Sequence, residues 1–364
     1  MARKARRQAA ATSRDVAALA GVSPMTVSRT LRTPELVTAG TRERVESAAR
    51  ELNYVPDLAA GALSSQKSGH VAVLLPSLRH TGFLRTVDGL SDTLRGHGYH
   101  ILIGDSYYSP DEQTELLRLV IGRRPEAIVL VASMDSAEAR KLLGQSGIPV
   151  VETWGRPAEP LDMVVGFSQH AAGRAMTESL VEQGYAHIGF LMGPPHSDPY
   201  AEQRRSGHLE VLAEHHLDAS IHVTVSDTPM EIADGVRGVA LLRERFPQAD
   251  ALICATDMTA LGALNECQRR GWRVPEALAI AGYGNFDFAA SLNPSLTTVR
   301  LPSYTIGVRA AERIIARIDG AARDEHAPLD LGFQVIHRDS TRRASRATGQ
   351  PAPPPDPILR EIDA

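Results

Sequence analysis

Residues 14–29 read Arg-Asp-Val-Ala-Ala-Leu-Ala-Gly-Val-Ser-Pro-Met-Thr-Val-Ser-Arg, and this stretch predicts two short helices joined by a tight turn. Val16, Leu19 and Ala20 recur at i, i+3 and i+4, a spacing that marks one face of the first helix. Gly21 supplies the backbone freedom that a sharp turn needs. The arrangement is typical of a helix-turn-helix, which binds DNA.

The second helix of this pair presents the surface that would read bases. Ser23 is suited to cap the helix, and Pro24 is suited to its first turn because it has no N–H to lose. Val27 and Leu31 are expected to face inward. The residues expected to face outward are Pro24, Met25, Ser28, Arg29 and Arg32. A helical hairpin with a solvated basic face is the alternative that periodicity alone leaves open.

A third helix is predicted over residues 38–52, with Thr41 as its N-cap. Its apolar positions are Val45, Ala48, Ala49 and Leu52. Three helices form a complete small core. After Pro56 comes a short alanine-rich stretch, residues 57–63, which is marginal as an isolated helix.

The motifs at residues 15–23, 26–29, 41–45 and 52–56 resemble those of the lac/gal repressor family. The resemblance implies that residues 57–63 form a hinge helix that folds only on operator DNA and pairs with its twin in a dimer. It also implies that Leu63 enters the minor groove, where an apolar wedge kinks the duplex; an ordinary apolar linker residue is the alternative. The expected DNA contacts are Thr12, Ser23, Pro24, Met25, Thr26, Ser28, Arg29, Arg32, Thr38, Thr41, Tyr54, Asp57, Ala60 and Leu63.

Two departures from the family pattern affect how DNA is read. Pro24 and Met25 stand where polar base-reading residues are common, so hydrogen-bond readout falls to Arg29, and Met25 is expected to pack on a thymine methyl. Asp57 and Leu58 stand where Asn and Arg are common, which makes the hinge more negative. Asp57 is expected to act as the N-cap of the hinge helix.

Charge separates the chain into two parts. Residues 1–67 contain eleven Lys and Arg against six Asp and Glu, a net charge of +5, whereas the whole chain carries −4 and the remainder therefore −9. Only the N-terminal part suits a polyanion, and its binding should weaken steeply with salt. The basic residues between positions 3 and 7 are expected to be disordered, either contacting phosphates or simply solvated.

Several functional classes are disfavoured by the composition. No stretch approaches the ~18 apolar residues of a membrane span, and the basic N-terminus leads into a helix-turn-helix, so a cytoplasmic protein is expected. Cys254 and Cys267 lack the pattern of a zinc site, and His196, His215 and His216 lack metal-like spacing. No nucleophile-base set or phosphate-binding glycine loop follows any strand, so neither an enzyme nor a cofactor is expected.

From residue 70 onward, apolar strands alternate with helical segments. The predicted strands are residues 71–75, 100–104, 127–131, 149–152, 163–167, 187–192, 221–225, 251–255, 278–283, 297–301 and 332–336. Their nearly continuous hydrophobicity indicates parallel sheets covered by helices. About 270 residues are more than a single domain with one hydrophobic core usually contains, so two α/β lobes are expected.

The predicted fold class is an all-α helix-turn-helix headpiece with a hinge helix, followed by a two-lobed α/β domain. The family resemblance implies a periplasmic-binding-protein-like fold for these lobes. The predicted division is a basic tail at 1–11, the helix-turn-helix at 12–56, a hinge at 57–68, an effector-binding and dimerisation domain at 69–337 and a flexible Pro-rich tail at 338–364. Within that domain, lobe 1 is expected at 69–167 and 297–328, and lobe 2 at 168–292 and 329–337.

Ligands of open parallel sheets bind beyond the carboxyl ends of the strands, and two such lobes face each other across a cleft. The expected effector-binding residues are Ser77, Phe83, Asp105, Tyr108, Glu152, Trp154, Arg204, Thr256, Asp257, Asn285 and Asp287. Arg204 matches the family's ligand-binding arginine and could hold a carboxylate or vicinal hydroxyls. The alternatives are helix capping for Ser77 and Asp257, lobe packing for Trp154, and an interlobe salt bridge for Arg204.

The expected effector is a sugar acid. Thr256 and Gly284 stand where the family often has Asn and Asp, and loss of a carboxylate eases the binding of an anion. Residues 147–154, 162–167, 280–283 and 286–288 resemble the gluconate-operon repressor branch, which implies gluconate or a related aldonate. The expected protein is a dimeric repressor of a pseudopalindromic operator, released when a sugar acid closes the lobes. A neutral sugar or nucleoside, a corepressor role, and a sugar-binding protein without a regulatory role remain alternatives.

Overall fold

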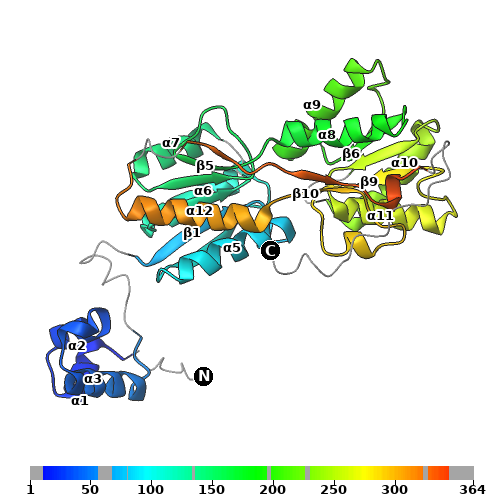
Figure 1. The fold of residues 1–364 in the computed structure, drawn as a ribbon. Coiled ribbons are helices and arrows are strands. Elements are labelled where there is room, and N and C mark those ends of the chain that lie inside the picture. Colours follow the sequence, from blue (N-terminus) through cyan, green and yellow to red (C-terminus); the bar gives the residue numbers. More distant parts are fainter. Residues whose placement is uncertain are drawn as a thin grey trace, which may run out of the picture. The chain divides into compact units, whose positions relative to one another are not determined.

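The computed structural model describes residues 11–55, 68–79, 81–132, 136–194, 198–225, 230–322 and 327–343. The chain divides into two compact units, before and after the boundary between Ser68 and Gly69 (Figure 1). The basic run at positions 3–7, the hinge residues Asp57, Ala60 and Leu63, and the Pro-rich segment from residue 344 lie outside the described residues.

The N-terminal unit is a three-helix bundle. It contains α1 (Ser13–Ala20), α2 (Pro24–Arg32), the 3₁₀ helix η1 (Pro34–Leu36) and α3 (Ala39–Glu51). Thr12 and Asp15 form a capping box at the start of α1, and Gly21 ends the helix in the left-handed region with φ 64°. The buried core residues are Val16, Ala17, Ala20, Val27, Val45 and Ala48.

Two sequence predictions in this unit are wrong. Leu19 is 48% exposed, and Ala17 takes its place in the core because the face of α1 that packs on α2 and α3 carries Val16, Ala17 and Ala20. Helix α3 begins at Ala39 with Thr38 at the N-cap position, so Thr41 lies inside the first turn, where its hydroxyl accepts a hydrogen bond from Thr38 (3.0 Å).

Lobe 1 of the second unit is built on a parallel six-stranded sheet in the order β11-β5-β4-β3-β1-β2. Its strands are β1 (His70–Leu75), β2 (His100–Asp105), β3 (Ala127–Val131), β4 (Val150–Thr153), β5 (Met163–Gly166) and β11 (Leu329–Asp330). Its helices are α5 (Thr81–Arg95), α6 (Pro110–Gly122), α7 (Ala137–Ser146) and α12 (Ser303–Ile318). The inner strands are buried on both faces, as their apolar sequences predict.

Lobe 2 repeats the architecture on a smaller scale, with a parallel four-stranded sheet in the order β7-β6-β8-β9. Its strands are β6 (Ile188–Met192), β7 (His222–Thr224), β8 (Ala251–Cys254) and β9 (Ala279–Ala281). Its helices are α8 (Gln169–Glu182), α9 (Pro199–Glu214), α10 (Ile232–Arg245), α11 (Asp257–Arg269) and the 3₁₀ helices η2 (Ala289–Ser291) and η4 (Asp339–Thr341).

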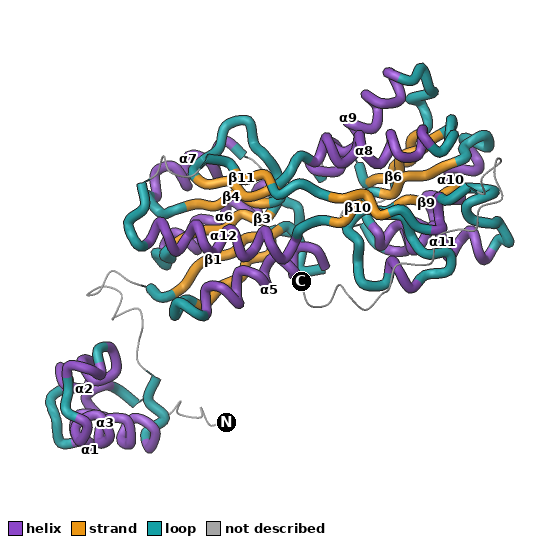
Figure 2. Tube along the Cα trace, viewed as in Figure 1, coloured by secondary structure: helices purple, strands orange, loops and turns teal. Residues whose placement is uncertain are grey.

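The chain passes between the lobes three times, and an antiparallel pair of strands, β10 (Thr298–Arg300) and β12 (Gln334–Ile336), lies at the junction (Figure 2). Thr297 and Arg300 bridge to Ala281 and Gly284 in lobe 2, so the second crossing follows β10 instead of preceding residue 297. The third crossing follows β11, because β11 pairs with β5 in the lobe 1 sheet. The predicted lobe boundaries at residues 297 and 329 are therefore wrong, because residues 297–300 lie with lobe 2 and residues 329–330 lie with lobe 1.

The predicted start of the C-terminal tail at residue 338 is also wrong. Ser340 and Thr341 are buried against lobe 2, where the Ser340 hydroxyl donates to the Ile280 carbonyl (2.6 Å) and Tyr185 donates to the Thr341 carbonyl (3.0 Å). The guanidinium of Arg343 lies 3.8 Å from the centre of the Tyr185 ring. Residues 338–343 therefore belong to the fold.

Helix pairs flank the sheets, and in three of them the backbones approach closely through glycines. The pairs are α5 with α12, α8 with α9, and α10 with α11. A Cβ atom built on Gly307 would lie 2.1 Å from the Thr86 carbonyl oxygen, and one on Gly235 would lie 1.9 Å from that of Thr259. Any side chain at these positions would push the paired helices apart.

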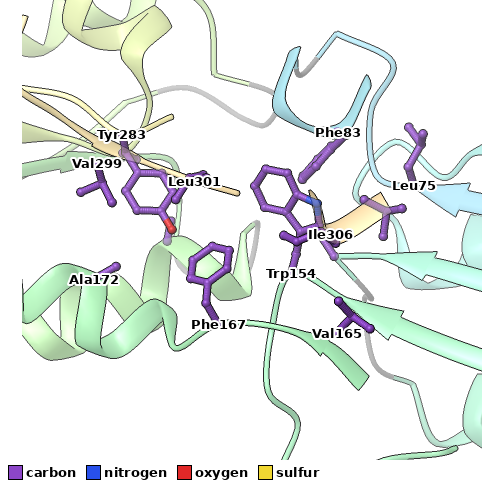
Figure 3. Packing of buried hydrophobic residues seen from close by; sticks show 14 of the residues in the cluster. Leu75, Phe83, Trp154, Val165, Phe167, Ala172, Tyr283, Val299, Leu301 and Ile306 are labelled. Atoms are coloured by element: carbon purple, nitrogen blue, oxygen red, sulfur yellow. The ribbon is translucent and has the colours of Figure 1, made fainter. Parts of the chain in front are cut away.

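One apolar core is continuous between the two lobes. Figure 3 shows the indole of Trp154 near Phe83 and Phe167, with Leu301 and Tyr283 toward lobe 2. The Phe83 ring stands edge-on to Trp154 with centroids 4.8 Å apart. Two small members of this core, Ala201 and Ala255, also lie at the cleft between the lobes.

Candidate functional site

Helix α2 places its predicted base-reading residues on an exposed face. The Ser23 hydroxyl accepts from the Thr26 amide (3.1 Å), which fixes the start of the helix. Met25 and Arg29 are exposed while Val27 is fully buried beneath them. Among the other expected contacts, Ser23, Pro24, Thr12 and Thr38 are exposed, and Thr26, Ser28, Thr41 and Tyr54 are partly buried. The side chain of Arg32 lies outside the described set.

A cavity of about 230 Å³ lies between the two lobes. Lobe 1 contributes Arg79 from the loop after β1 and Tyr108 from the loop after β2. Lobe 2 contributes Gly193, Asp198, Ala201, Met230, Glu231, Ala255, Thr256, Met258 and Phe286. Charged and hydroxyl groups thus surround an apolar wall, a combination that fixes the orientation of a small polar ligand.

An ion pair joins the two sides of this cavity. The Arg79 guanidinium donates to the Glu231 carboxylate at 2.8 Å, and the two side chains are 72% and 59% exposed. Glu231 stands at the N-cap position of α10, where it forms a capping box with Asp234. Ser77 positions the arginine, since its buried hydroxyl accepts from the Arg79 amide (3.1 Å).

Arg204 lies behind the cavity and does not line it. Its guanidinium donates to the Gln169 side chain (2.8 Å) and the Ala255 carbonyl (3.2 Å) and stacks on the Tyr283 ring at 4.1 Å. The Asp198 carboxylate, which caps α9, approaches it at 3.7 Å. The arginine thus supports two residues of the cavity wall, Asp198 and Ala255.

Tyr283 and Tyr108 remain phenols over the physiological range. Burial raises the pKa of both hydroxyls above the ordinary value of 10. The Tyr283 hydroxyl donates to Gln169 (2.6 Å), whose amide nitrogen in turn donates to the Trp154 carbonyl (2.9 Å). These hydrogen bonds connect the back of the cavity in lobe 2 to lobe 1.

Asp257, which we expected in the cleft, is a buried framework residue. One carboxylate oxygen accepts from the Thr298 hydroxyl (2.6 Å) and the other from the Phe286 amide (2.8 Å). Burial raises its pKa to about 6. The N-cap of α11 is Thr256, so the capping alternative for Asp257 is wrong as well.

Phe83, Trp154 and Glu152 also lie away from the cavity. Trp154 is buried in the core and its indole N–H donates to the Thr86 hydroxyl (2.9 Å), so lobe packing explains it. The buried Glu152 carboxylate accepts from the Leu161 amide (2.7 Å) and does not line the cavity. An aromatic or acidic residue at a strand end lines a cleft only where its side chain points outward.

Three further expected residues do not line the cavity. Asp105 accepts from the amides of Leu78 (3.3 Å) and Tyr107 (3.0 Å) and so holds two lobe 1 loops together. Asn285 accepts from the Arg338 side chain (2.8 Å), and Asp287 is exposed. Of the eleven expected residues, Tyr108 and Thr256 line the cavity.

Sequence reasoning missed most of the lobe 2 wall. Asp198, Ala201, Met230 and Glu231 come from the loops and helix starts that follow β6 and β7, which obey the same carboxyl-end rule as the loops that were considered. Arg79 lies two residues after Ser77. Their position after the strands is therefore a signal that the sequence does contain.

A helix-turn-helix bundle joined to a two-lobed α/β unit with a ligand-sized cleft defines a ligand-responsive DNA-binding regulator. Residues 12–57 match the model of bacterial regulatory proteins of the lacI family, and residues 177–341 match that of the periplasmic binding protein-like domain. The chain is 33% identical to the HTH-type transcriptional regulator GntR of Escherichia coli over 88% of its length and 96% of that protein. It is 35% identical to GntR of Pseudomonas aeruginosa, over 91% and 95%. The chain belongs to the lacI family of transcriptional regulators.

Solved structures agree with this assignment. A LacI-family regulator from Silicibacter pomeroyi superposes with a TM-score of 0.85 at 32% identity, covering 92% of this chain and all of the other. The GntR regulator of Chromobacterium violaceum gives 0.70 at 35% identity, covering 75% and 99%. The Lac repressor dimer bound to operator shares the fold at 23% identity, with a TM-score of 0.77.

The described residues contain neither a candidate membrane-spanning helix nor a candidate metal-binding cluster. None of their helices combines the length and the apolar character needed to cross a membrane. Nor do they contain three His, Cys, Asp or Glu side chains grouped so as to hold a metal ion.

Proposed function

We propose that this regulator is a homodimeric repressor that acts on chromosomal DNA in the cytoplasm, binds a pseudopalindromic operator and is released by a sugar acid such as gluconate. The observation that carries the effector class is the cleft cavity, which combines an accessible arginine with hydroxyl and carboxylate groups in about 230 Å³. That volume lies below the usual range for ligand pockets, roughly 300–1,000 Å³. It suits a single small polar molecule of the size of a six-carbon acid better than a disaccharide.

The chemistry of the lining also favours a polyhydroxylated acid. Asp198 can accept hydrogen bonds from sugar hydroxyls, and Thr256 and Tyr108 can donate or accept. Met258 and Phe286 offer an apolar surface to the carbon chain. We assign Arg204 an indirect role: Arg204→Ala should impair the effector response through Asp198 and Ala255 while operator affinity persists.

For DNA recognition we propose that α2 enters the major groove. Its exposed Arg29 would read a guanine and Met25 a thymine methyl, because these are the contacts that their side chains favour. The remaining proposed contacts are Thr12, Ser23, Pro24, Thr26, Ser28, Arg32, Thr38, Thr41, Tyr54, Asp57, Ala60 and Leu63. Leu63→Ala should lower operator affinity while effector binding persists.

The proposed dimer uses the edge of the lobe 1 sheet. Strand β2 lies at that edge, and its neighbouring residues Leu102 and Ile103 are each 45% exposed, on opposite faces of the strand. An exposed apolar edge strand is a ready surface for a second chain. Leu102→Asp should yield a monomer in sedimentation experiments, whereas Leu36→Asp, an exposed leucine in the headpiece, should remain dimeric. A Leu102→Asp dimer would place the interface elsewhere.

The decisive experiment is fluorescence anisotropy of a labelled duplex from the gene's own upstream region, at fixed salt, with gluconate added to the preformed complex. We expect tight binding, a steep loss with added salt and release by gluconate. Glucitol, which has the same chain length without the carboxylate, is the control. Binding strengthened by gluconate would indicate a corepressor, and release by glucitol alone would indicate a neutral effector.

A further inference from the structure

The two arginines at the cleft differ in how available they are to a ligand. Arg204 is 6% exposed and its guanidinium already contacts Gln169, Ala255 and the Tyr283 ring. A ligand carboxylate could reach it only by replacing buried hydrogen bonds. Arg79 is 72% exposed, lines the cavity, and contacts Glu231 from the opposite lobe.

Replacing Glu231 by a ligand carboxylate as the partner of Arg79 would cost little free energy. An ion pair this exposed contributes little to stability, because water screens it and two long side chains must be ordered. A carboxylate enclosed by the closing lobes can instead accept two parallel hydrogen bonds from the guanidinium, which is a stronger arrangement. A neutral sugar offers nothing that replaces the charge of Glu231.

The other charges of the cavity fix the orientation of the ligand. Asp198 lies on the lobe 2 wall beside Arg204, so a second carboxylate is repelled there and sugar hydroxyls are preferred. Arg79 comes from lobe 1, where Tyr108 is the other lining residue. The acid end of the ligand would thus lie at Arg79 and the hydroxyl end toward Asp198.

We propose that Arg79 binds the carboxylate of the effector and that Glu231 competes for it, so that this pair selects sugar acids over neutral sugars. The inference rests on the proposed sugar-acid effector and assigns the residues that recognise its charge. Glu231 then weakens the binding of an anionic ligand, whereas an ordinary ligand contact strengthens binding.

Isothermal titration of the full-length protein with gluconate and with glucitol tests the assignment. Arg79→Gln should weaken gluconate binding roughly 10- to 100-fold, the worth of one charged hydrogen bond, and change glucitol binding less than threefold. Glu231→Gln should tighten gluconate binding several-fold. The matched control is Arg156→Gln, because Arg156 forms an ion pair of the same 2.8 Å length with Asp330, is half exposed and does not line the cavity.

The outcomes separate this assignment from the proposed effector class. Unchanged gluconate affinity in Arg79→Gln, or equal losses for gluconate and glucitol, would overturn the role of Arg79 while the sugar-acid effector stands. A wild-type protein that binds glucitol as tightly as gluconate, or binds neither, would overturn the effector class and the assignment with it. Retained operator affinity in Arg79→Gln shows that the variant is folded.

Discussion

Lobes 1 and 2 both place a parallel sheet beside helices paired through glycines, yet they hold their sides of the cleft in different ways. In lobe 2 the wall residue Phe286 is tied to strand β10 through the fully buried Asp257. In lobe 1 the corresponding carboxylate, Asp105, is partly exposed and holds a loop whose Tyr107 and Tyr108 have φ values of 51° and 56°. The lobe 2 wall thus depends on a fully buried carboxylate, and the lobe 1 loop depends on a partly exposed one.

The largest expected effect tests this difference directly. Asp257→Ala leaves the Thr298 hydroxyl and the Phe286 amide buried without an acceptor, so we expect a loss of about 4 kcal/mol in the free energy of unfolding. Asp105→Ala, at a partly exposed site, should cost about 1 kcal/mol. Urea unfolding followed by circular dichroism measures both. Equal losses would contradict the contrast between the two lobes.

The two lobes should lose similar stability when a glycine between their paired helices is replaced, because both pairs pack through such glycines. Gly307→Ala in lobe 1 and Gly235→Ala in lobe 2 each place a methyl group about 2 Å from a backbone oxygen of the paired helix, at 2.1 and 1.9 Å. We expect each to cost about 3 kcal/mol, measured by thermal unfolding. Gly144→Ala in α7 is the control, because its Cβ would meet no atom within 4 Å and should stabilise the helix slightly. A neutral result at Gly307 alone would mean that the lobe 1 helix pair can separate.

The free energy of unfolding of Asp257→Asn, measured at two pH values, tests the burial of Asp257 with a side chain of nearly the same shape. Burial raises the pKa of Asp257 from 3.8 to about 6, so the native state keeps the proton longer than the unfolded chain does. The resulting stabilisation is complete below pH ~4 and is lost as the pH rises through about 6. Asp257→Asn has no proton to lose, so its stability relative to wild type should rise by up to about 3 kcal/mol between pH 4 and 7.

Urea unfolding at both pH values provides the measurement for this comparison. His208, whose pKa burial lowers to about 3, is present in both proteins and cancels in the difference. A difference between the two proteins that does not change with pH would show that Asp257 is ionised throughout.

The smallest expected effect concerns the buried hydrogen bond in lobe 2 between Tyr283 and Gln169, whose side chain also donates to Trp154 of lobe 1. Tyr283→Phe removes the donor to Gln169, and because Gln169 still accepts from Arg204, we expect a loss of only about 1 kcal/mol. Tyr304→Phe, which removes an exposed hydroxyl bonded to Asp92 (3.2 Å), is the control and should be nearly neutral. Losses of the same size at Tyr283 and Tyr304 would show that the buried network adds nothing beyond a surface contact.

The sequence predicted strands and the DNA-reading helix well because their signals are local. Each of the eleven predicted strands has a counterpart, and Ser23 and Pro24 begin α2 as expected. The missed strand, β11, has two residues and exists only through its pairing with β5. A pattern that needs several residues to repeat cannot reveal it.

The cleft was predicted less well because the partner of a polar side chain is decided by tertiary structure. Trp154 and Asp257 both follow strands, but the first donates to Thr86 and the second accepts from Thr298, partners 68 and 41 residues away in the sequence. Ser340 and Thr341 are polar and near the C-terminus, yet they are buried because lobe 2 offers matching backbone groups. The residues next to Ser340 and Thr341 in the sequence give no indication of this burial.

The three crossings between the lobes have a mechanical consequence. Three neighbouring links, two of them joined as the antiparallel pair β10 and β12, let the lobes bend toward each other but resist twisting and sliding. We therefore expect the lobes to close mainly by one hinge motion. A single distance, for example between spin labels on α7 and α10, would therefore report the whole closing motion, and every group on the cleft walls would move in proportion to it.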